Sequence, residues 1–304
     1  MPESSSYQDY VAGLLAGVAT VAIGHPFDTV KVKLQKYNTE AHGIKYRNGL
    51  HCASRVLRTE GVKGLYRGAT SSFVGVAFES SLLFGIYSQM KQSLQKGNSQ
   101  NSKPDLHVIV PSAAYGGGVI SFVLCPSELV KCRMQVQGTD SLVPKSSRYS
   151  GPLDCALKTV KSEGVQGIFC GGYTTFLRES IGNAVFFSVY EYVTYYMHLQ
   201  FKSSSSNYNN LIDVGTGIMS GGLGGVAFWC AVLPLDVAKT VIQTASSSTS
   251  PRNPFHILNT IYRRTGFRGF YTGLGPTIVR AFPANAAAIV TWELAVKLLG
   301  IKRD

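Results

Sequence analysis

Charged residues are scarce in this sequence: Asp, Glu, Lys and Arg make up 15% of its 304 residues, against about 25% in a soluble globular protein. Acids are the scarcer sign, with 17 against 29 bases and a net charge of +12. The bases gather between apolar segments, as in residues 36–68, where seven Lys or Arg stand against two acids. This bias is typical of loops that meet a negatively charged membrane leaflet, and it argues against a nucleic-acid-binding protein.

Signatures of catalysis and of targeting are also missing. The six cysteines form no CxxC pair and no His/Cys spacing of a metal site, so reduced thiols packed as small apolar side chains are expected. Neither a GxxxxGK[ST] loop nor a Ser/His/Asp arrangement occurs, which makes an enzyme the least favoured class. Residues 1–10 hold two acids and no Arg, so any organelle address is expected to be internal.

Long uninterrupted apolar helices are lacking too, since the mean hydropathy is only +0.08. Helices of such composition need polar faces, as around a water-filled cavity. Six segments still reach the length of about 20 residues that crosses a membrane. They are 10–36, 70–94, 108–137, 172–198, 211–243 and 274–299. Short amphipathic stretches lie at 48–59, 151–162 and 254–265.

One ten-residue pattern occurs three times, at intervals of 100 and 108 residues, and each copy ends an odd-numbered apolar segment. It starts at Pro26, Pro126 and Pro234, and each proline should kink its helix. An acid, a base and a glutamine follow each proline; they are Asp28, Lys31 and Gln35, then Glu128, Lys131 and Gln135, then Asp236, Lys239 and Gln243. Charges on three membrane-length segments point to function.

The pattern divides the chain into three tandem repeats of about 100 residues that form one integral domain. Their limits are 1–100, 101–207 and 208–304. In a threefold bundle the acid of one repeat reaches the base of the next. The predicted pairs are Asp28–Lys131, Glu128–Lys239 and Asp236–Lys31. These six residues, called the charged ring below, would close one end of a central cavity.

Glycines mark two further features of each repeat. Small residues stand 13 and 9 positions before each proline, at Gly13/Gly17, Ala113/Gly117 and Gly221/Gly225, a spacing that predicts close helix packing in lipid. A second motif follows each amphipathic stretch and ends at Gly68, Gly171 and Gly273. Its glycines fit either tight turns or helix starts that bind a lipid phosphate, and both interpretations stay open.

Four charges on the even-numbered segments break the threefold symmetry: Glu79, Arg178, Glu179 and Arg280. A charge that breaks the symmetry of a membrane protein fits an asymmetric ligand, although a structural network of the four is the alternative. Arg binds a carboxylate bidentately, and carboxylates accept from ammonium or guanidinium groups. The four residues therefore predict a site for a zwitterion with an additional positive end.

The triple P-x-[DE]-x-x-[KR] motif, with the glycine motif after it, resembles the mitochondrial carrier family over residues 10–299. The resemblance implies an all-α membrane protein in which six transmembrane helices surround a central cavity, with three short matrix helices and both termini facing the intermembrane space. It implies that the charged ring is a matrix gate, braced by Gln35, Gln135 and Gln243. It also implies a cytosolic gate, with Lys91, Glu191 and Glu293 as candidates and Lys91–Glu293 as the complete pair.

The same resemblance implies a function. The Arg178-Glu179 dipeptide is similar to that of amino-acid carriers, and Glu79 favours their basic amino-acid branch. The expectation is inner-membrane transport of arginine, ornithine, lysine and histidine by alternating access, with exchange favoured. Alternatives are a carnitine/acylcarnitine carrier and an uncoupling-type proton or anion leak. A monomer without a cofactor is expected, with bound cardiolipin left open. Val241, Cys170 and Thr272 depart from the family pattern, each replacing a base.

Overall fold

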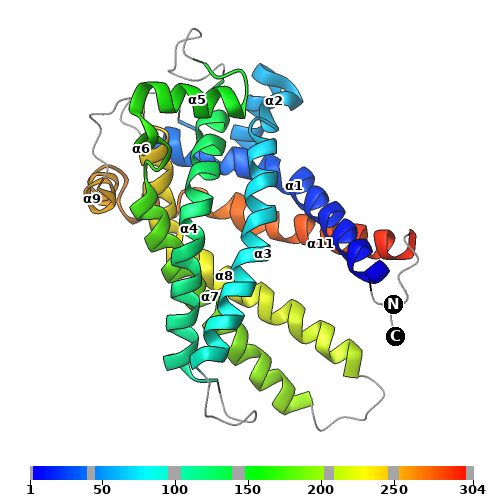
Figure 1. The fold of residues 1–304 in the computed structure, drawn as a ribbon. Helices are drawn as coiled ribbons and strands as arrows, with labels where there is room; N and C mark the ends of the chain where they lie inside the picture. Colours follow the sequence, from blue (N-terminus) through cyan, green and yellow to red (C-terminus); the bar gives the residue numbers. More distant parts are fainter. Residues whose placement is uncertain are drawn as a thin grey trace. The chain divides into compact units, whose positions relative to one another are not determined.

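The computed structural model describes residues 3–39, 45–94, 104–138, 148–201, 209–245 and 253–298, and every regular element in these ranges is a helix (Figure 1). Six helices are long: α1 (Glu3–Thr39), α3 (Ala69–Leu94), α4 (Leu106–Val136), α7 (Gly172–Phe201), α8 (Asn209–Gln243) and α11 (Leu274–Leu298). Five are shorter: α2 (Gly49–Leu65), α5 (Pro152–Glu163), α6 (Val165–Ile168), α9 (Pro254–Thr265) and α10 (Phe267–Phe270). The six apolar segments and the three amphipathic stretches are thus confirmed as helices.

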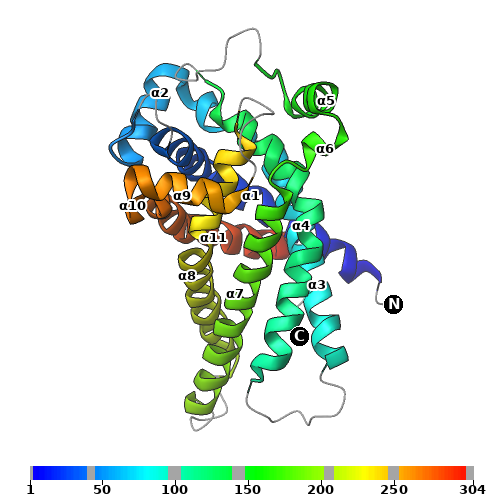
Figure 2. The same ribbon diagram turned by 90° about the vertical axis from the view of Figure 1, so that its left-hand side faces the viewer.

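The chain forms two compact units, and each takes pieces of all three repeats. The first unit comprises 1–79, 124–171 and 237–304, and the second comprises 80–123 and 172–236. Within the first unit α1 packs along α11, and both α2 and α9 contact α1 (Figures 1 and 2). The second unit holds the whole of α7 and parts of α3, α4 and α8.

The long helices carry polar as well as apolar side chains. Among the described residues, α4 and the Gly215–Gln243 part of α8 are long and apolar enough to cross a membrane on composition alone. The prolines of the repeated pattern lie inside α1, α4 and α8, and each helix continues past its proline into the charged ring. Such mixed helices fit a bundle whose interior is polar, because backbone groups bond within each helix while polar side chains face inward.

Glycines of the second motif make the turns that separate the short helices from the next long helix. Gly61, Gly164 and Gly266 have φ between 65° and 72°, with ψ near 180°, a conformation that is essentially restricted to glycine. The final glycines, Gly68, Gly171 and Gly273, have φ of 78° to 92°. The glycines thus make turns that lead into helix starts in all three repeats, and lipid-phosphate binding stays a prediction.

A buried ion pair links each of the first two Pro motifs to its own glycine motif. Lys33 Nζ lies 2.8 Å from Glu60 Oε1, and both side chains are only 1% exposed. Arg133 Nη2 lies 2.7 Å from Glu163 Oε1 in the second repeat. At the equivalent positions the third repeat has neutral residues on both sides, Val241 and Thr265. The base missing from the third Pro motif is thus matched by a missing acid.

The neutral residues of the third repeat suggest a test of how the Lys33–Glu60 pair affects stability. Glu60→Thr leaves Lys33 buried without its carboxylate, which should cost about 3–5 kcal/mol. Adding Lys33→Val removes the buried cation as well, and replacing a buried pair with apolar groups is often close to neutral. The double variant should therefore melt at a higher temperature than Glu60→Thr in a detergent thermal-shift assay. Equal melting temperatures would show that Lys33 does not depend on Glu60.

The predicted small-residue packing is found in one repeat of three. A Cβ at Gly117 would collide with the backbone carbonyl of Glu179, so this glycine lets α4 and α7 approach closely. A Cβ at Gly17, Gly221 or Gly225 would meet no described atom within 4 Å, so the described residues show no close packing at these three glycines. The spacing is common on long helices, and it names no partner helix.

Candidate functional site

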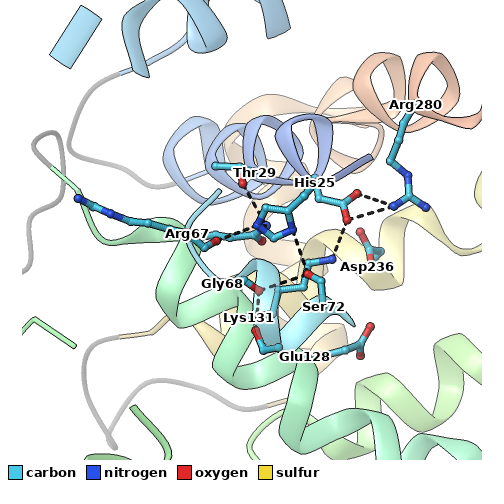
Figure 3. Close-up of polar contacts among 12 residues, drawn as sticks. His25, Thr29, Arg67, Gly68, Ser72, Glu128, Lys131, Asp236 and Arg280 are labelled. Atoms are coloured by element: carbon cyan, nitrogen blue, oxygen red, sulfur yellow. Dashed lines mark hydrogen bonds and ion pairs between the residues drawn. The ribbon is translucent and has the colours of Figure 1, made fainter. Parts of the chain in front are cut away.

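Two pairs of the charged ring are formed in the first unit. Lys131 Nζ on α4 donates to Asp28 Oδ2 on α1 at 2.7 Å (Figure 3). Lys239 Nζ on α8 lies 2.5 Å from Glu128 Oε2 on α4. In both cases the acid of one repeat meets the base of the next, as the sequence predicts. Asp236 belongs to the second unit and Lys31 to the first, so the Asp236–Lys31 pair stays a prediction.

The three repeated glutamines, on α1, α4 and α8, are fully buried. Gln135 Nε2 donates to Thr29 Oγ1 at 3.2 Å, which ties α4 to α1. Gln35 Oε1 accepts from Thr240 Oγ1 at 2.8 Å, which ties α1 to α8. These bonds hold the helices together just beyond the ion pairs, and direct bracing of the pairs stays a prediction for all three glutamines, including Gln243.

Arg280 joins the charged ring, which the sequence did not predict. Its Nη1 donates to both carboxylate oxygens of Asp28, at 3.0 and 3.1 Å (Figure 3). Asp28 therefore holds two cations, Lys131 and Arg280, while its own side chain is 15% exposed. The Arg280 side chain is 32% exposed, so it remains open to a ligand while it bonds Asp28.

Arg178 repeats this arrangement in the second unit. Its Nη1 lies 3.4 Å from Asp236 Oδ1, and its Nη2 bonds Glu179, the next residue of α7. Asn183, one turn further along α7, donates to Glu179 Oε2 at 3.1 Å. Both Arg178 and Glu179 are buried, so the two charges compensate each other inside the protein.

Counting along the sequence shows that Arg178 and Arg280 occupy equivalent positions of their repeats. Arg178 and Arg280 stand seven residues after the last glycine of their second motifs, Gly171 and Gly273. Positions related by the threefold repeat are expected to face equivalent neighbours, and in both cases that neighbour is the acid of the following Pro motif. The signal was in the sequence, but only the structure shows which residues these positions meet.

Two predicted site residues lie in helices whose side chains fall outside the described residues. They are Glu79 in α3 and Glu293 in α11. The cytosolic-gate candidate Lys91 forms an ion pair with Glu191, which also accepts a 2.9 Å bond from the Tyr87 hydroxyl. The Tyr87 ring stacks on Phe187 with centroids 3.7 Å apart. Lys91 thus contacts the acid of the next repeat, and the predicted Lys91–Glu293 pair stays untested.

Comparisons with known proteins agree with this architecture. The sequence model of the mitochondrial carrier protein family matches residues 2–98, 108–201 and 212–303. The chain is 65% identical to the mitochondrial arginine transporter BAC1 of Arabidopsis thaliana, over 98% of this chain and 96% of that protein. It is 35% identical to a mitochondrial carnitine/acylcarnitine carrier-like protein of Arabidopsis thaliana, over 98% of this chain and 100% of that protein.

A third relative extends the likeness beyond plants. The chain is 34% identical to the mitochondrial basic amino acids transporter of Bos taurus, over 93% of this chain and 89% of that protein. The family match is triple, and it covers the three regions that the repeated motif marks out. On these grounds the chain belongs to the mitochondrial carrier family.

Proposed function

We propose that this carrier moves arginine, ornithine, lysine and histidine across the mitochondrial inner membrane by alternating access, in exchange for one another. It acts as a monomer with both termini facing the intermembrane space, and cardiolipin is a bound lipid. The observation that carries the proposal is the buried Arg178–Glu179 pair, a zwitterionic site in a membrane-length helix. The 65% identity to a protein named as an arginine transporter supports the same substrate class.

Each site residue binds a different group of the substrate. Arg280 holds the α-carboxylate, because its guanidinium is one-third exposed and offers paired donors. Glu179 accepts the α-ammonium, and Arg178 and Asn183 orient the Glu179 carboxylate. Glu79, on α3, accepts from the cationic side chain of the substrate.

Substrate binding is coupled to the charged ring through Arg280. Arg280 Nη1 donates to Asp28 Oδ1 at 3.0 Å. A substrate carboxylate competes with Asp28 for the same guanidinium, so substrate binding weakens the Arg280–Asp28 contact between α11 and α1. Lys131 then remains as the Asp28 partner, and the Asp28–Lys131 and Glu128–Lys239 pairs must separate for substrate to pass toward the matrix.

Uptake by purified protein in liposomes tests the function. Labelled arginine, ornithine, lysine and histidine should enter rapidly when the liposomes contain unlabelled basic amino acid and slowly when they are empty. Carnitine should neither enter nor compete. An uncoupling-type leak would instead give proton or anion conductance without any substrate, so the same liposomes should be measured for conductance.

Glu79 carries a sharper prediction about specificity. Glu79→Gln removes one charge-assisted contact, which should lower arginine and lysine uptake by about 10- to 150-fold. Weak uptake of neutral amino acids such as citrulline or glutamine should change little, since they have no cationic side chain. The measurement is the initial rate for each substrate, corrected for reconstituted protein. An equal loss for cationic and neutral substrates would make Glu79 a structural residue.

A further inference from the structure

Arg178 and Arg280 occupy equivalent positions, yet they differ in how open they are to a ligand. The Arg280 side chain is 32% exposed, whereas that of Arg178 is 7% exposed. Both guanidiniums bond the acid of a Pro motif, Asp28 for Arg280 and Asp236 for Arg178. The position in the repeat therefore does not explain the difference in exposure, and we looked for its cause in the neighbouring residues.

The neighbour of Arg280 on α1 is Gly24. A Cβ built on Gly24 would lie 3.5 Å from both Cδ and Nη1 of Arg280, and 3.6 Å from the Cβ of Ala284. Gly24 stands four residues before Asp28, so the two residues share one face of α1. The Arg280 side chain therefore lies over the bare backbone at Gly24, and its guanidinium reaches Asp28 one helical turn further along.

The two other repeats have larger side chains at this position. Leu124 and Val232 stand, like Gly24, two residues before their prolines, and both are buried. Each arginine bonds the acid of the following Pro motif, so Val232 is the counterpart of Gly24 on the side of Arg178. The buried arginine thus corresponds to a valine, and the exposed arginine corresponds to a glycine.

We propose that Gly24 is a positioning residue that makes Arg280, rather than Arg178, the binding group for the α-carboxylate of the substrate. This inference rests on the proposed function and deepens it, since it names the residue that selects between two equivalent arginines. Without a side chain at position 24, the Arg280 guanidinium has room to leave Asp28 and turn to a carboxylate. A valine there would add two methyl groups to a Cβ already in contact with the guanidinium, and they would fill that room.

Gly24→Val tests the proposal by giving the first repeat the residue of the third. In competition with labelled arginine in liposomes, the Ki of unlabelled arginine should rise about 10-fold or more, as for the loss of one charge-assisted contact. The Ki of agmatine, which has no carboxylate, should change little. Gly17→Val is the matched control on the same helix, because a Cβ at Gly17 would meet no described atom within 4 Å. It should leave both Ki values unchanged.

A binding measurement separates this role from a general effect on transport. Arginine should raise the melting temperature of the unmodified protein in detergent more than agmatine does at the same concentration, because the tighter ligand stabilises the folded state more. In Gly24→Val the two ligands should give nearly equal shifts. Gly24→Ala should fold like the unmodified protein, since its Cβ makes only ordinary contacts, and should show the same selective loss in weaker form.

The outcomes separate this inference from the proposed function. If the unmodified protein takes up no arginine, the proposed function fails and this inference fails with it. If it does, and Gly24→Val weakens arginine and agmatine by the same factor, Gly24 acts on packing alone and the inference is overturned. An unchanged Ki for arginine overturns it as well. If Gly24→Val does not fold, Gly24→Ala decides by the same comparison, and equal effects on the two ligands contradict the proposal.

Discussion

Arg280→Ala is expected to abolish uptake of every basic amino acid, with a loss of about 100-fold or more in reconstituted liposomes. All substrates share the α-carboxylate, and Arg280 is the one-third-exposed guanidinium proposed to bind it. Loss of a bidentate charge-assisted contact costs about 1.5–3 kcal/mol, and a displaced substrate loses further rate from misalignment. Arg280→Lys keeps the charge without the fork of donors, so an intermediate rate is expected.

The bond between Arg280 and Asp28 offers a different reason for such a loss, and a triple variant separates the two. Asp28→Asn and Lys131→Gln added to Arg280→Ala neutralise the whole cluster, so neither a carboxylate nor a lysine is left without its partner. If Arg280 acts mainly by holding Asp28, this triple variant should recover uptake relative to Arg280→Ala. The account predicts no recovery, because the α-carboxylate still lacks its donor.

Lys131→Ala is expected to impair transport and to lower the melting temperature, because it removes a lysine 2.7 Å from Asp28. Breaking a partly buried pair costs up to about 3–5 kcal/mol. Reversing both charges, Asp28→Lys with Lys131→Asp, should restore little stability, since the new lysine faces Arg280. Reversing Glu128 and Lys239 should restore more.

Thermal unfolding in detergent measures both reversals, each compared with its two single variants. Reversal at Glu128 and Lys239 is favoured because the first repeat has Gly75 at the position equivalent to Arg280. Equal recovery at the two pairs would mean that Arg280 has no energetic hold on Asp28. Recovery at neither pair would contradict the pairing itself.

The helices and two ring pairs could be predicted because the sequence repeats them. Three copies of one motif predict where the helices end, and they predict that the acid of one repeat pairs with the base of the next. The partners of Arg178 and Arg280 could not be predicted in the same way. They depend on how α7 packs against α8 and α11 against α1, and neither motif predicts these helix contacts.

Two other predictions show where a local pattern is insufficient. Completeness of the motif predicts Glu293 as the Lys91 partner and leaves out Glu191, which Lys91 contacts in the structure; the Lys91–Glu293 pair itself stays untested. Small residues at a spacing of four allow close packing, yet of the four glycines compared above Gly117 alone has described atoms of a neighbouring helix against it. A spacing of small residues shows that a helix could pack closely, but it does not identify the helix that packs against it.

Competition by arginine analogues tests the central claim most directly, namely that the site recognises both ends of a basic amino acid. The measurement is inhibition of labelled arginine uptake in liposomes by agmatine, which lacks the α-carboxylate, and by citrulline, which lacks the side-chain charge. Each loses one charge-assisted contact, so each should inhibit at least about 10-fold more weakly than unlabelled arginine. Inhibition by agmatine or citrulline as strong as that by arginine would contradict the account.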